Sequence, residues 1–396
     1  MSTINLKNNI IQTTAGKSAI LLLNFVIVVL STRWWGTEGR GAIALFIANL
    51  SLITSVTNIF TSSSVSYFLL KRGLFTLVLQ AYLWVFIVAV ILGIVFRIYD
   101  HNTPSLLLFI VAVFVGFTTF HSSVFIGDQR IGYYNLITVL QPVFHIIFLL
   151  FFYYCIDKSY FAYFYGMISS YVFIFIICKI LTRKTHGKVS YHLDKSTIKD
   201  TFSYGWQIEL SSFLQFFNYR LSYYFLGTAS LGVFSIGVTL SEAIWIVSRS
   251  ISLVQYSNVV KQGDTADSRK ETKSTGKYSF FISLFCLIVV LCLPKHVFSL
   301  VFGEGFEGVK QVVLLLSPGI LAMAVSNVYG NYFSAIGRVK ILILKSAVGV
   351  VVTVALSIWL IPSLQVAGAC IVNASSYIVS SAILFWFFYK KTSNKM

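Results

Sequence analysis

The sequence of 396 residues is poor in charged residues and in cysteine. Asp, Glu, Lys and Arg together make up 11% of the chain, whereas 57% of the residues are hydrophobic and the mean hydropathy is +0.81. A soluble core does not need that much apolar surface, so a soluble multidomain enzyme is excluded. The five cysteines contain no CxxC pair, and the sequence therefore predicts neither a disulfide framework nor a metal site.

Motifs of enzymatic chemistry are also missing. The chain has no phosphate-cradling GxxxxGK[ST] loop and no Ser-His-Asp order that its spacing would single out. Glu304 and Glu307 are the only adjacent pair of acids in a segment predicted to lie outside, and a solvated loop face explains them. The sequence thus favours a protein that is not an enzyme and needs no cofactor.

Long apolar runs dominate the sequence instead. A helix needs about 20 apolar residues to cross a bilayer, and the runs are continuous rather than alternating, which favours helices over the strands of a barrel. The sequence therefore predicts an all-α integral membrane protein with about twelve transmembrane helices. The predicted spans lie near 13–34, 41–68, 74–96, 104–126, 133–154, 159–182, 204–227, 230–257, 278–298, 309–334, 340–361 and 366–389.

Positive charge is distributed unevenly between the two sides of these spans. With a cytoplasmic N-terminus, most of the 30 Lys and Arg residues fall in inner segments, as the positive-inside rule requires. We therefore expect both termini to be cytoplasmic. The same bias explains the formal charge of +17, so no nucleic-acid partner is expected, and the basic inner segments are predicted to contact anionic membrane lipids.

A weak internal repeat divides the chain into two halves. At a single offset of 191 residues, the loop after the first span matches the loop after the seventh at three positions, and polar residues pair inside the spans: Gly36 with Gly227, Thr37 with Thr228, Gly41 with Gly232, and Asn24 with Gln215. We expect two six-helix lobes, 1–182 and 204–396, joined by a basic cytoplasmic linker at 183–203. Parallel repeats of this kind hold their substrate between the halves in many transporters.

Ionisable residues inside predicted spans are costly and mark a functional hypothesis, and four of them stand out. Glu209 and Arg220 lie in the seventh span, and Glu242 and Arg249 lie in the eighth. One interpretation is a pair of interhelical ion pairs that hold the two spans together. The other is a water-filled cavity in which the arginines attract an anionic headgroup, because a guanidinium stays protonated and binds phosphate through two hydrogen bonds.

Further polar residues of the spans are candidates for the same cavity. They share an amide or guanidinium group at a position predicted to lie within or at the end of a span, and they are Asn24, Arg33, Asn58, Gln215 and Asn218. Singly, such residues also serve as hydrogen-bonding contacts between helices. The sequence leaves both roles open.

Several stretches carry a resemblance to a known family. They are Arg33 with the loop 36–41 (Gly-Thr-Glu-Gly-Arg-Gly), 204–205, 218–220 (Asn-Tyr-Arg), 231–236, 242–245, 301–306, 315–319 and 331–338. In order and spacing they resemble the polysaccharide-transporter branch of the multidrug/oligosaccharidyl-lipid/polysaccharide (MOP) exporter superfamily, which contains the O-antigen flippases. The chain departs from many members at Ser222, where those members have an acid two residues after the arginine of the seventh span.

This resemblance implies a MATE-like, V-shaped arrangement of two six-helix lobes around a cationic cavity. It implies that the cargo is an undecaprenyl-diphosphate-linked oligosaccharide, flipped by alternating access from the cytoplasmic to the periplasmic leaflet of a bacterial inner membrane. The polysaccharide polymerase and the chain-length regulator are the protein partners it suggests. If transport is coupled to a gradient of H⁺ or Na⁺, Glu209 and Glu242 are the acids available inside the spans.

Two alternatives remain at the level of sequence. A surface-polysaccharide polymerase would be expected to display a larger outer loop than the roughly fifteen residues predicted here. A multidrug or cation antiporter of the same superfamily would more often carry acids in the first six spans, and this chain has none there. Both alternatives fit less well than a flippase with an anionic cargo.

Overall fold

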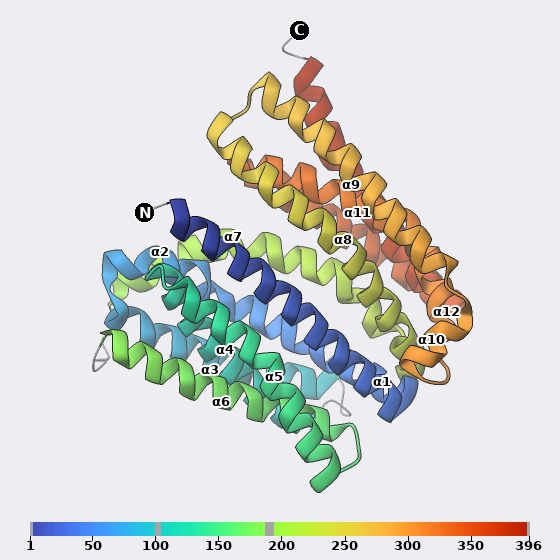
Figure 1. Cartoon of the computed structure of the whole chain (residues 1–396), viewed down its shortest axis with the longest axis horizontal. Helices are drawn as coiled ribbons and strands as arrows, with labels where there is room; N and C mark the ends of the chain where they lie inside the picture. Colours follow the sequence, from blue (N-terminus) through green and yellow to red (C-terminus); the bar gives the residue numbers. More distant parts are fainter. Residues whose placement is uncertain (1–2, 100–103, 187–193, 394–396) are drawn as a thin grey trace. The chain divides into compact units, whose positions relative to one another are not determined.

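The computed structural model describes residues 3–99, 104–186 and 194–393, and every regular element in these ranges is a helix (Figure 1). The predicted all-α class is confirmed. The elements are α1 (Thr3–Thr61), α2 (Ser63–Arg72), α3 (Leu74–Tyr99), α4 (Ser105–Gly127), α5 (Ile131–Cys155), α6 (Phe161–His186), α7 (Lys195–Arg220), the 3₁₀ helix η1 (Leu221–Phe225), α8 (Thr228–Gln262), α9 (Ala266–Cys292), α10 (Lys295–Phe302), α11 (Val309–Ala335) and α12 (Val339–Ser393).

Two of these helices are bent and hold two predicted spans each. The backbone leaves helical geometry at Gly36 (φ 60°, ψ −159°) in α1 and at Gln365 (φ 48°, ψ −123°) in α12. Nine helices of the described chain are long and apolar enough to cross a bilayer, judged by length and composition. If the two bent helices count twice and the more polar α7 is added, the twelve predicted spans are all accounted for.

The chain forms two compact units. Unit 1 comprises residues 1–35 and 46–213, and unit 2 comprises residues 36–45 and 214–396. Both α1 and α7 therefore contribute residues to each unit. The lobe boundaries derived from the repeat, 1–182 and 204–396, stay a prediction, and residues 187–193 of the proposed linker lie outside the described residues.

In unit 1, buried side chains of α1, α2, α3 and α4 form a common apolar core around Ile59, Leu77 and Phe120. A second cluster joins α4, α5 and α6 through Phe125, Ile137 and Ile174. Helix packing inside a membrane relies on close van der Waals contact rather than on a hydrophobic force between helices. The continuous apolar runs of the sequence supply the side chains for both clusters.

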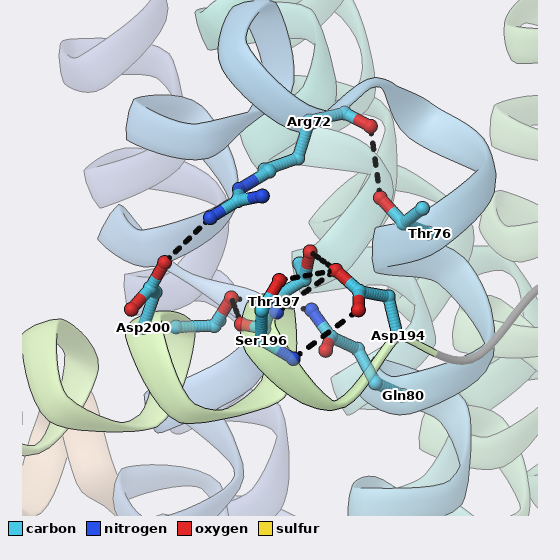
Figure 2. A network of polar contacts seen from close by, with 8 residues as sticks. Arg72, Thr76, Gln80, Asp194, Ser196, Thr197 and Asp200 are labelled. Carbon is cyan, nitrogen blue, oxygen red and sulfur yellow. Dashed lines mark hydrogen bonds and ion pairs between the residues drawn. The ribbon is translucent and has the colours of Figure 1, made fainter.

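The first turn of α7 is fastened by polar contacts (Figure 2). Asp194 precedes the helix, and its carboxylate accepts hydrogen bonds from the hydroxyl groups of Ser196 (2.6 Å) and Thr197 (2.5 Å) and from the backbone N–H of Thr197 (3.1 Å). This is an N-cap, which satisfies donors that have no partner within the helix. One turn later, Arg72 of α2 forms a 2.7 Å ion pair with Asp200.

We expect Asp194→Ala to lower the thermal unfolding midpoint at pH 7, because the variant leaves the first-turn donors of α7 uncapped. The hydrogen bonds from Ser196 and Thr197 lower the pKa of the Asp194 carboxyl. A lowered pKa stabilises the fold above the unfolded value of about 3.9, and this stabilisation is lost as the pH falls toward the folded value. The unfolding midpoints of the unaltered protein and of Asp194→Ala, measured in detergent, should thus differ at pH 7 and converge as the pH falls below about 4. Equal midpoints at pH 7 would contradict the capping role.

Unit 2 contains a helix crossing in which two glycines touch backbone. A Cβ atom on Gly41 would lie 1.8 Å from the carbonyl oxygen of Thr228, and one on Gly232 would lie 2.0 Å from the carbonyl oxygen of Thr37. The 191-residue offset exchanges Gly41 with Gly232 and Thr37 with Thr228, so the two contacts are equivalent under the predicted repeat. Their reciprocity supports that repeat.

Gly41→Ala and Gly232→Ala should each destabilise the protein by about 1–3 kcal/mol or more, because a methyl group would overlap with a backbone carbonyl that has little room to move. Gly227→Ala is the matched control, since a Cβ atom there would meet no atom within 4 Å. Thermal unfolding of the three purified variants in detergent tests this. A midpoint for Gly232→Ala equal to that of Gly227→Ala would show that the crossing is not tightly packed.

Candidate anion-binding site

Arg220 lies where α7 ends and the chain tightens into η1. Its Nη2 atom is 2.7 Å from Oε1 of Glu242 in α8, and its Nη1 atom donates a hydrogen bond of 2.9 Å to the hydroxyl of Tyr223. Both charged side chains are largely buried, with 18% and 29% of their surface exposed. The ion pair therefore joins the end of α7 to α8, and it neutralises much of the charge of Arg220.

An aromatic cluster lies beside this ion pair. Tyr219, Trp245 and Tyr377 are buried together with Met323, and the ring of Tyr377 packs edge-to-face against the other two at centroid distances of 5.4 and 5.7 Å. Gln215 donates a hydrogen bond to the hydroxyl of Tyr219. The cluster packs the end of α7 against α8, α11 and α12, and aromatic pairs of this geometry contribute beyond their buried area.

Asn218 connects α7 to both halves of α12. Its side-chain oxygen accepts hydrogen bonds from Thr353 and from Ser376 (2.7 Å), and the residue is 3% exposed. Ser222, at the position where many members of the resembled family have an acid, donates a 2.6 Å hydrogen bond to Asn373. These polar residues serve the packing of unit 2, as buried amides and hydroxyls do when their partners are supplied by neighbouring helices.

Arg249 and Lys345 form a second, unneutralised group of charges. Arg249 of α8 is exposed, whereas Lys345 of α12 is 7% exposed, and the two lie close enough for their positive charges to repel each other. Within the described residues, neither side chain forms an ion pair with an acid. Burying an unpaired ammonium beside another cation is costly unless an anion is bound there.

Together with Arg40, these residues define a cation cluster made of Arg40, Arg220, Glu242, Arg249 and Lys345. Arg40 is 5% exposed and interacts electrostatically with Tyr223, the residue that also binds Arg220. Tyr219 likewise interacts with Arg220, Glu242 and Arg249. The cluster thus carries four positive charges and one negative charge on connected side chains of unit 2.

Comparison with known proteins identifies the family of the chain. Residues 41–311 match the family described as polysaccharide biosynthesis protein. The chain belongs to this family. No curated protein sequence matches the chain at a significant level.

Several solved structures have a fold similar to that of this chain. A multidrug resistance MATE family transporter of the MOP superfamily, in its inward-facing conformation, is similar with a TM-score of 0.75 at 14% identity, covering 95% of each chain. The lipid II flippase MurJ, in an inward closed conformation, is similar with a TM-score of 0.72 at 11% identity, covering 96% of this chain and 87% of MurJ. A MOP superfamily transporter from Pyrococcus furiosus has a TM-score of 0.66 at 15% identity and covers 97% and 94%. The predicted resemblance to the MOP superfamily is confirmed at the level of the fold.

The sequence-predicted site residues are divided between the two units. Unit 2 holds Gln215, Asn218, Arg220, Glu242 and Arg249, and unit 1 holds Asn24, Arg33, Asn58 and Glu209. In unit 1, Asn24 and Arg33 are exposed on α1, and the side-chain oxygen of Asn58 is 3.5 Å from the hydroxyl of Thr61. Glu209 is 7% exposed and accepts a hydrogen bond from Ser62.

Lys345 and Arg40 are the members of the cation cluster that sequence analysis did not single out. Lys345 lies five residues inside the predicted span 340–361, near the end predicted to be cytoplasmic, so the positive-inside rule alone accounts for it. Arg40 was read as part of a loop, yet α1 continues through it as helix. The sequence does contain a signal for both residues, because each lies next to or within an apolar run. A basic residue at such a position can be buried even when it lies near the end of a span.

Removing one partner of the Arg220–Glu242 pair should destabilise unit 2. We expect Arg220→Ala to lower the free energy of unfolding by about 1–3 kcal/mol, because the Glu242 carboxylate keeps its burial and loses its charged donor. The charge-reversed double variant Arg220→Glu with Glu242→Arg should recover part of that loss. Chemical unfolding in detergent measures both. A double variant no better than the sum of its single substitutions would mean that the ion pair contributes nothing.

Proposed function

We propose that the protein flips an undecaprenyl-diphosphate-linked oligosaccharide, the repeat unit of an O-antigen or a related surface polysaccharide, from the cytoplasmic to the periplasmic leaflet of a bacterial inner membrane. The membership in a polysaccharide biosynthesis family and the fold of MOP superfamily transporters support this proposal. The observation that carries it is the cation cluster of unit 2, and above all Lys345, a buried ammonium that no acid among the described residues neutralises.

The chemistry of the cargo fits this cluster. A headgroup with two phosphates and many hydroxyls cannot enter hydrocarbon without partners for its polar groups. Arg249 offers a planar guanidinium that can hold a phosphate through two hydrogen bonds, and Lys345 offers a compact charge next to it. Binding an anion would relieve the repulsion between the two cations. Transport of this kind needs no covalent step.

The two acids of the predicted spans differ in what they can contribute. Glu242 is ion-paired with Arg220, so it limits the positive charge of the cluster. Glu209 is buried in unit 1, accepts a hydrogen bond from Ser62, and has no ion-pair partner among the described residues. We therefore assign the binding of a coupling H⁺ or Na⁺ to Glu209 rather than to Glu242, should transport depend on a gradient.

A multidrug exporter is the second candidate, because a multidrug MATE transporter has the same fold. Its cargo would be an amphipathic drug instead of a glycolipid. The excess of positive charge in the cation cluster disfavours a cationic drug, since the nearest binding charges would repel it. The cargo assay described next separates the two functions.

Substitution of the unpaired cations should slow transport strongly while the fold is kept. We expect Lys345→Met and Arg249→Gln each to lower the rate of flipping at least tenfold, because each removes one charge that binds the diphosphate, and Arg249→Lys to retain part of it. The measurement is the share of lipid-linked oligosaccharide that an added enzyme can reach from the periplasmic side, in cells that lack the chromosomal gene and carry each variant at equal protein level.

The control is Lys340→Met, which removes an exposed lysine from the first turn of the same helix, α12. This variant should flip at the rate of the unaltered chain. Normal flipping by Lys345→Met and Arg249→Gln would remove the cation cluster from the mechanism. If cells without the protein still expose single repeat units on the outside and fail only to join them, the protein is a polymerase and not a flippase.

A further inference from the structure

Unit 2 also contains a cavity of about 390 Å³ that the cation cluster does not include. It is lined by Thr37, Ala229, Ser230, Val233, Gly305, Gly308, Gln311, Val312, Leu315, Val366 and Ala367. A ligand pocket for a small molecule typically starts at about 300 Å³, so the cavity can hold a group the size of a single ring. The residues of the cation cluster and of the aromatic cluster do not line this space.

The cavity lies at the end of unit 2 where several helical segments begin. Thr37 follows the bend of α1 at Gly36, Ala229 and Ser230 belong to the first turn of α8, Gln311 belongs to the first turn of α11, and Val366 follows the bend of α12. In Figure 1, α10 lies at the same end of unit 2 as the bend of α12. By the positive-inside rule, this end is predicted to face the periplasm.

The lining is uncharged and mostly apolar, with three polar side chains. Thr37, Ser230 and Gln311 supply two hydroxyl groups and one amide, and their side chains make no hydrogen bond to another described residue. The other lining residues are small or apolar. The exposed acids Glu304 and Glu307 flank the glycines of the cavity wall, which disfavours an anion there.

Glycine keeps this space open. Gly305 has a φ of 86°, which a side chain would strain. Gly308 is different, because its φ of −63° suits any residue and a Cβ atom there would meet its nearest neighbour, Val233, at an ordinary 3.4 Å. The backbone does not require glycine at position 308. Its missing side chain is instead what leaves room in the cavity.

We infer that this cavity binds an uncharged sugar ring of the cargo on the periplasmic side. The inference rests on the proposed flippase function and deepens it. A sugar ring presents hydroxyl groups around its edge and C–H groups on its faces, which match a lining of three hydrogen-bonding side chains among apolar and small residues. The diphosphate would bind elsewhere, at Arg249 and Lys345, so the two ends of one headgroup have separate sites of different chemistry.

The test uses the full chain purified in lipid nanodiscs and saturation-transfer NMR. The probes are the methyl glycosides of glucose, galactose, mannose, rhamnose, N-acetylglucosamine and N-acetylgalactosamine. Inorganic pyrophosphate is the charged comparison, and its binding is followed by line broadening in phosphorus NMR because it has no carbon-bound proton for saturation transfer. We expect a saturation-transfer signal from at least one glycoside. Gly308→Leu should reduce that signal at least tenfold by filling the cavity, and Gln311→Leu at least threefold by removing the amide at similar size.

The matched control is Gly227→Leu. Gly227 precedes α8 as Gly308 precedes α11, has a φ of −65°, and has no atom within 4 Å of an added Cβ, but it does not line the cavity. Gly227→Leu should bind the glycosides as the unaltered chain does. The line broadening of pyrophosphate should persist in Gly308→Leu and be lost in Arg249→Gln. Absence of signal from every glycoside, equal signals from Gly308→Leu and Gly227→Leu, or loss of pyrophosphate binding in Gly308→Leu would overturn the inference.

The leaflet assay distinguishes failure of this inference from failure of the proposed function. If the unaltered chain exposes no lipid-linked oligosaccharide to the periplasmic enzyme, the flippase function itself is wrong. If the unaltered chain flips and Gly308→Leu flips as fast as Gly227→Leu, the flippase function stands and the sugar site is wrong. A flipping rate at least tenfold lower for Gly308→Leu alone supports both.

Discussion

At several crossings in this protein a helix approaches the backbone of its neighbour closely, because a glycine leaves out the side chain. Gly41 and Gly232 lie against the carbonyl groups of Thr228 and Thr37, and in unit 1 a Cβ atom on Gly205 would be 2.0 Å from the carbonyl oxygen of Ile59. Helices in a bilayer gain little from excluding water, so their association depends on such close approach. The crossing at Gly41 and Gly232 fixes where α1 meets α8, and this meeting point positions Thr37 at the wall of the cavity.

The polar side chains of unit 2 separate into two groups by whether they have partners. Asn218, Ser222 and the Arg220–Glu242 pair are satisfied by neighbouring helices, and they stabilise the packing. Lys345 and Arg249 repel each other and have no acidic partner among the described residues. Because an unpaired buried charge is costly, a protein keeps one where a ligand supplies the opposite charge. For this reason we propose Lys345 and Arg249, rather than every charged residue of the spans, as the binding site of an anionic cargo.

The two proposed sites divide the headgroup of a glycolipid according to its chemistry. Cations suit the diphosphate, and the uncharged cavity near Gly308, which sets three polar side chains among apolar ones, suits a sugar. Separate sites would allow one part of the cargo to vary while the other is bound in the same way. Selectivity for particular sugars would then depend on Thr37, Ser230 and Gln311, whereas affinity for the shared diphosphate would depend on Arg249 and Lys345.

The sequence by itself determined the all-α membrane class, the approximate spans and the family resemblance, because each follows from local apolar runs and short motifs. It also indicated the reciprocal match of Gly41 with Gly232. Tertiary structure decided which polar residues are satisfied: it joined Arg220 to Glu242, joined Asn218 to α12, and left Lys345 buried without an acid. It also created the cavity from residues of α1, α8, α11 and α12 that are far apart in the chain. Which side chains on different helices come into contact depends on the rotation of each helix about its axis and on its depth in the membrane. Neither quantity can be read from a single apolar run.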